Sequence, residues 1–131
     1  MFKTYLLFGL FISFISSLGA SVYVSKYYEL IADFSSILPF WKITATFFSV
    51  GLFLAGFHFV LNKLFLKLGL LIFNITLSLL TLSSILFPIM KADFPDSLEM
   101  TEFYPGFVIP LHFILPLFWL ALSPLIKKNE N

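Results

Sequence analysis

Four long runs without a charged residue divide this chain of 131 residues. They cover residues 4–25, 43–62, 68–90 and 103–126, and each is bounded by lysine or glutamate. A helix rises about 1.5 Å per residue and a bilayer core is about 30 Å thick, so about 20 apolar residues cross it. Each run is therefore long enough for one crossing. The alternation of polar and apolar residues that is typical of barrel strands does not occur in them.

We therefore expect an all-α fold, an integral membrane four-helix bundle in one domain (1–131), with spans at about 4–25, 43–62, 68–90 and 105–126. The composition supports this class, because 60% of the residues are apolar and only 11% are charged. Soluble domains are about 25% charged, and disordered chains are still more polar. Both classes are excluded.

The first run has a second interpretation. A basic residue followed by an apolar stretch and small residues also describes a cleaved signal peptide, with Gly19 and Ser21 near the cut. We favour a retained span, because the apolar stretch resumes at residues 22–24.

The distribution of lysine predicts the orientation. With the N-terminus inside, five lysines fall on the inner side (3, 63, 67, 127 and 128) and three on the outer side (26, 42 and 91). Basic residues concentrate on the cytoplasmic side, so we expect both termini there, in a multi-pass protein of a plasma or bacterial inner membrane. No arginine and no basic stripe occur, which excludes nucleic-acid binding, and the lack of cysteine excludes disulfides and thiolate sites.

The two outer connections have distinct patterns. Residues 26–38 carry apolar side chains at helical spacing, which predicts an amphipathic helix lying in the membrane interface. The acidic loop 91–106 has Asp93, Asp96, Glu99 and Glu102 at every third residue. One interpretation is that these carboxylates attract cations or a basic partner. The other is that Asp96 and Glu99 cap one short helical turn.

Small and weakly polar residues mark two helix faces. Helices in lipid associate through such residues, so they predict contact surfaces. The first span has a packing face at four-residue spacing: Gly9, Ser13, Ser17, Ser21 and Ser25. In the third span, Asn74, Ser78 and Thr81 form a stripe that is either a helix contact or the wall of a narrow polar path.

The two histidines lie in different spans and at different depths. Spans two and four both run from the outer to the inner side, which places His58 near the inner face and His112 near the outer face. Their depths then differ by roughly 15 Å, so one haem iron cannot join them. Pro110 and Pro116 flank His112, which is either a proton or cation locus near Glu99 and Glu102 or part of a kinked helix. We expect His58 to be a packing residue bonded to Asn62. The sequence contains no catalytic constellation, and we expect no metal and no cofactor.

The order of span, amphipathic segment, second span, short basic turn, third span, acidic loop and fourth span is similar to small four-helix DoxX-like membrane proteins. The resemblance covers the layout of most of the chain. It implies no functional residue.

Three functions agree with these features. The first is a non-enzymatic accessory, assembly or scaffolding subunit that uses the packing face to join a homo-oligomer or larger membrane complex. The second is a small oligomeric transporter or channel for an ion or solute, with Asn74, Ser78 and Thr81 along its path and His112 and Glu102 at its mouth. The third is a lipid- or quinone-handling protein in which the interfacial helix acts as a gate.

Overall fold

The computed structural model describes residues 1–90, 94–96 and 99–128 of the chain. Within these ranges the fold is all-helical, without strands. The four long helices are α1 (Phe2–Leu30), α2 (Phe40–Phe65), α3 (Gly69–Met90) and α4 (Tyr104–Leu122). Short 3-10 turns, Leu66–Leu68 and Thr101–Phe103, precede α3 and α4, and a final short helix α5 spans Pro124–Lys128.

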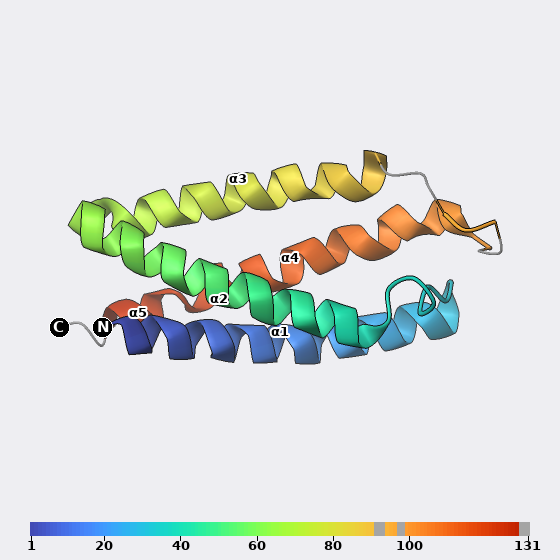
Figure 1. The fold of residues 1–131 in the computed structure, drawn as a ribbon, viewed down its shortest axis with the longest axis horizontal. Coiled ribbons are helices and arrows are strands. Elements are labelled where there is room, and N and C mark those ends of the chain that lie inside the picture. Colours follow the sequence, from blue (N-terminus) through green and yellow to red (C-terminus); the bar gives the residue numbers. More distant parts are fainter. Residues whose placement is uncertain (91–93, 97–98, 129–131) are drawn as a thin grey trace.

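The long helices lie side by side in an elongated molecule (Figure 1). The N-terminus, α5 and the hairpin between α2 and α3 lie at one end, which we call the terminal end. The connection between α1 and α2 and the turn Thr101–Phe103 before α4 lie at the other end, which we call the loop end. From their hairpin, α2 and α3 diverge toward the loop end (Figure 1).

Three helical stretches are long and apolar enough to cross a membrane: Phe2–Leu30, Phe40–Met90 and Thr101–Ile126. The second stretch is 51 residues long and contains both α2 and α3, which turn back on each other at the hairpin. A rise of about 1.5 Å per residue makes each of its two arms comparable in length to a bilayer core.

Small residues allow α1 and α2 to approach closely. A Cβ atom on Gly9 would lie 2.7 Å from the Gly51 carbonyl oxygen and 2.8 Å from the Ala55 Cβ. Ser13 contacts Gly51 one turn further along α1. Its hydroxyl lies 2.8 Å from the Gly9 carbonyl oxygen and 3.0 Å from the Phe47 carbonyl oxygen, so it can bond across the helix pair. Close packing of this kind is how helices associate in lipid.

The hairpin between α2 and α3 is tight. Leu66 has φ 45° and ψ −110°, a conformation in which a leucine side chain is strained. Gly69 follows, and a Cβ atom there would lie 2.6 Å from the Asn62 Cα. A glycine is therefore required where α3 begins against the end of α2.

Two prolines lie inside α4 and a third follows it, and side-chain hydroxyls lie near two of the carbonyls that lose a backbone donor. Pro110 has no N–H for the Gly106 carbonyl. The Tyr23 hydroxyl lies 3.2 Å from that oxygen and 3.0 Å from the Phe107 carbonyl oxygen. At the other end Pro124 ends the regular helix, and the Ser123 hydroxyl donates to the Leu120 carbonyl at 3.2 Å.

Aromatic residues join the helices at both ends of the molecule. The loop-end cluster centres on Phe107, which lies 5.6 Å from Phe34 and 5.1 Å from Tyr28 between ring centroids. The terminal-end cluster takes at least one ring from each long helix. Its members, all buried, are Tyr5, Phe8, His58, Phe73 and Trp119.

The amphipathic helix predicted over 26–38 is not formed. Residues 26–30 continue α1, and the chain from Ile31 to Pro39 consists of turns. Phe34 is fully buried in the loop-end cluster, and the Tyr28 hydroxyl donates to the Leu38 carbonyl at 2.7 Å. Burial of Phe34 within the protein takes the place of the interfacial contact that the helical spacing predicted. Of the acidic loop 91–106, residues 91–93 and 97–98, including Asp93, lie outside the described residues.

Candidate functional site

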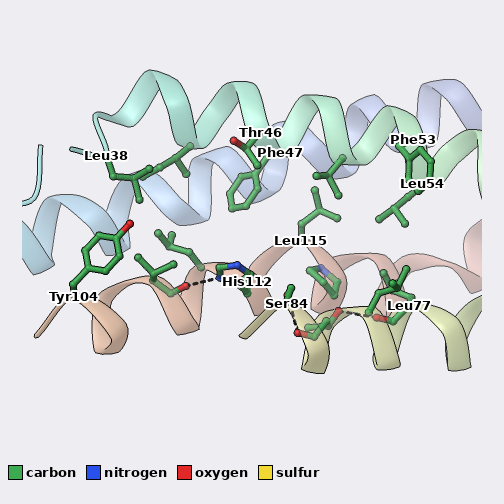
Figure 2. A pocket seen from close by; sticks show the side chains of 17 residues that line it. Leu38, Thr46, Phe47, Phe53, Leu54, Leu77, Ser84, Tyr104, His112 and Leu115 are labelled. Atoms are coloured by element: carbon green, nitrogen blue, oxygen red, sulfur yellow. Dashed lines mark hydrogen bonds between the residues drawn. The ribbon is translucent and has the colours of Figure 1, made fainter. Parts of the chain in front are cut away.

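A cavity of about 460 Å³ lies between the two aromatic clusters, bounded by α2, α3 and α4. We call it the side cavity. Figure 2 shows Phe47 and Leu54 of α2 on one side, with Leu77 of α3 and His112 and Leu115 of α4 on the other. Such a volume falls in the range of small-molecule sites.

The side cavity opens toward the outer surface of the helices. Three of its lining residues, Val50, Phe53 and Leu80, are 41%, 66% and 50% exposed. These belong to the broad apolar surface of the molecule. An apolar molecule could therefore enter from the side without passing a polar barrier.

His112 is the one titratable imidazole of this lining. Its Nδ1 lies 2.9 Å from the Val108 carbonyl oxygen in the same helix. Because a carbonyl oxygen only accepts, Nδ1 carries the proton, and in the neutral ring Nε2 is an acceptor. Pro116 also leaves the His112 carbonyl without its usual helical N–H partner. Both acceptors suit a ligand that donates a hydrogen bond.

The hydroxyls of Thr46, Thr81 and Ser84 in the lining are engaged within their own helix, whereas no hydrogen bond within the described residues engages the Tyr104 hydroxyl, which also belongs to the lining. Thr81 donates to the Leu77 carbonyl and Ser84 to the Thr81 carbonyl, each at 2.8 Å (Figure 2). No lysine, aspartate or glutamate lines the cavity among the described residues. The cavity is thus largely apolar, with its free hydrogen-bonding capacity at His112 and at the Tyr104 hydroxyl.

The residues predicted to form a polar path separate into two groups. Thr81 and His112 both line the side cavity, whereas Asn74 and Ser78 do not. Ser78 is exposed and donates to the Asn74 carbonyl at 2.8 Å. Glu99 and Glu102 are exposed near the loop end and line neither that cavity nor the second cavity described below.

The predicted packing face of α1 is used in part within the chain. Gly9, Ser13 and Ser17 are buried, and the first two contact α2. Ser21 is half-buried and Ser25 is exposed. The buried part of this face is not accessible to a second protein.

His58 is a packing residue, as expected, but without the predicted hydrogen bond. Its ring is buried in the terminal-end cluster, 4.3 Å from the Phe73 ring and 5.0 Å from the Tyr5 ring between centroids. The predicted bond to Asn62 is absent, because the Asn62 amide instead donates to the Tyr5 hydroxyl at 2.6 Å. Both ring nitrogens of His58 lack a hydrogen-bond partner among the described residues.

Sequence reasoning missed a second cavity, of about 980 Å³, at the terminal end. His58 lines it together with Asn62, Lys63 and Lys67. The spacing along α2 gave part of the signal for this cavity, since positions 58 and 62, four residues apart, lie on the same face of a helix. The groups of α1 and α5 that complete the cavity are not evident in the sequence.

Among the described residues, no group of three or more histidine, cysteine, aspartate or glutamate side chains could hold a metal ion. Comparisons with protein-family models, curated proteins and solved structures find no match to this chain. The candidate sites therefore rest on geometry alone.

Proposed function

We propose that this protein crosses a bilayer four times, through α1 to α4, with both termini on the cytoplasmic side. The lengths and apolar surfaces of the helices support this topology, as does the reversal between α2 and α3. The exposed residues Lys3, Lys63 and Lys67 lie toward the terminal end, as the preference of lysine for the cytoplasmic side requires.

Within that topology, its function is to bind a lipid- or quinone-like amphiphile in the side cavity, without catalysis. The observation that supports this function is a largely apolar cavity, open to the side, in which His112 offers a free acceptor. The fitting ligand has an apolar tail and a hydroxyl head, as in a quinol or a monoacylglycerol. The site depends on the cavity and needs no interfacial helix as a gate.

The other two functions receive less support. The accessory-subunit function relied on the face of α1 that now packs partly on α2. The channel function needs a continuous polar wall, and the hydroxyls of Ser78, Thr81 and Ser84 bond to their own helix.

Two neighbouring leucines provide a matched test. Leu80 lines the side cavity, whereas Leu79 is 59% exposed and does not. We would purify the full chain in mild detergent and titrate it with a short-tailed benzoquinol and with a monoacylglycerol, following binding by native mass spectrometry. Leu80→Trp should fill the cavity and abolish binding, while Leu79→Trp should leave it unchanged.

His112→Phe should weaken binding about tenfold, which corresponds to one lost hydrogen bond of about 1.4 kcal/mol. Binding of neither probe, or equal loss in the two tryptophan variants, would contradict the proposal. The proposal would also be contradicted if the unchanged protein had the mass of a dimer and the Leu80→Trp variant that of a monomer. The cavity would then be a surface for self-association.

A further inference from the structure

The terminal-end cavity combines basic and buried polar groups. Lys63 and Lys67 lie on its rim and are exposed, and the N-terminal residue Met1 also lines it. Within the described residues no carboxylate faces this cavity. Its electrostatic potential therefore favours an anion.

A buried group without a partner lies in the same cavity. His58 is only 1% exposed, and both its ring nitrogens lack a hydrogen bond in the described part of the chain. An imidazole ring carries at least one N–H, and a buried donor is almost always satisfied in a stable protein. An oxygen atom in the cavity would satisfy it.

Much of the remaining wall is apolar, although Tyr5, Asn62 and Ser123 also line the cavity. Phe59 and Leu70 face the cavity from α2 and α3, and Ile126 faces it from α5. The volume of about 980 Å³ is far more than a free inorganic anion needs. A charged head joined to apolar chains matches both parts of the wall.

We propose that the terminal-end cavity binds the phosphate group of an anionic phospholipid. Lys63 and Lys67 hold the phosphate through their ammonium groups, and the ring N–H of His58 donates to an oxygen of the bound head group. The acyl chains leave along the apolar wall. This site is separate from the side cavity and does not depend on the function proposed there.

The test uses the full chain in detergent with ¹⁵N-histidine labelling. The chain has only His58 and His112, so the spectrum contains two histidines, and the His112→Phe variant assigns them. The probes are phosphatidylglycerol, diacylglycerol with the same acyl chains, and inorganic phosphate. Phosphatidylglycerol should move the His58 signal, and diacylglycerol should not.

Lysine variants test the electrostatic part. The double variant Lys63→Gln, Lys67→Gln should weaken phosphatidylglycerol binding about tenfold or more, since each charged hydrogen bond contributes substantially. Lys3→Gln is the control, because Lys3 is exposed and does not line the cavity. It should change the affinity less than twofold. His58→Phe keeps an aromatic ring in the cluster and should also weaken binding.

Each outcome decides the question. A His58 shift with phosphatidylglycerol alone supports the lipid source, and a shift with inorganic phosphate at similar affinity supports the phosphate site but assigns a soluble source. If neither phosphatidylglycerol nor inorganic phosphate shifts the His58 signal, the proposal is overturned. The proposal is also overturned if Lys3→Gln weakens phosphatidylglycerol binding as much as the double lysine variant does, since binding would then depend only on net charge.

Discussion

Gly9 of α1 lies against Gly51 of α2 so closely that neither residue has room for a side chain. A Cβ atom on Gly9 would be 2.7 Å from the Gly51 carbonyl oxygen, and one on Gly51 would overlap Ser13. This contact fixes how near the first two helices come. A single methyl group on Gly9 would therefore force the two helices apart.

Gly9→Ala should therefore destabilise the protein by about 1–3 kcal/mol, the usual cost of overpacking. Gly56 is the matched control, because nothing lies within 4 Å of a Cβ built there. Gly56→Ala should be neutral or stabilise by about 0.5–1 kcal/mol, since glycine weakens a helix. Thermal unfolding in detergent measures both, and a similar loss in the two variants would disprove the close approach.

Two buried serines of α1 should respond in opposite ways. The Ser13 hydroxyl bonds to backbone carbonyls, whereas the Ser16 hydroxyl is buried without a partner among the described residues. Ser13→Ala should lower the free energy of unfolding by about 1 kcal/mol. Ser16→Ala should leave it unchanged or raise it, because an unsatisfied hydroxyl is removed. Denaturant titration in micelles compares them, and a larger loss for Ser16→Ala would show that its hydroxyl does have a partner.

Replacing Leu66 with glycine should stabilise the fold. Its φ of 45° and ψ of −110° are strained for leucine and open to glycine. We expect Leu66→Gly to raise the free energy of unfolding by about 1 kcal/mol. Leu68→Gly, in the same turn at a residue without positive φ, should lower it by about 0.5–1 kcal/mol. Unfolding midpoints of the two variants measure these changes. A lower midpoint for Leu66→Gly than for the unchanged protein would show that Leu66 is not strained.

Asp33 gives a pH dependence outside the helices. The Ser35 backbone N–H donates to its carboxylate at 2.8 Å, and this bond lowers the pKa of Asp33 below its ordinary value. A lowered folded-state pKa stabilises the folded chain above the unfolded pKa, and this stabilisation is lost as the pH falls through the folded pKa. Carboxyl NMR titration should give a lower pKa for the folded than for the denatured chain. Equal values would mean that the turn is not formed.

The helices were predictable from the sequence because charge and hydrocarbon are incompatible over long stretches. The first three predicted spans each overlap one helix closely, as residues 43–62 do with α2 (Phe40–Phe65). The end of α4 was less predictable, since Pro124 divides the last predicted span into α4 and α5. The number of membrane crossings and the orientation remain predictions.

The sites were less predictable because they depend on how each helix is rotated against its neighbours. Helical spacing at 26–38 could not reveal that Phe34 would pack on Phe107 of a distant helix. Similarly, Asn62 lies one turn from His58 in the sequence, yet its amide bonds to Tyr5 of α1. The side cavity arises from the divergence of α2 and α3, which no local pattern encodes.

The burial of Trp119 has an optical consequence. Its indole is fully buried beside Phe8 and Phe73, whereas Trp41, the only other tryptophan, is 66% exposed near the loop end. Brominated acyl chains should thus quench the fluorescence of Trp41 and leave the emission of Trp119 intact. In a bilayer or micelle, Trp41 would thus report on contact with acyl chains, and Trp119 on whether the interior of the protein stays packed.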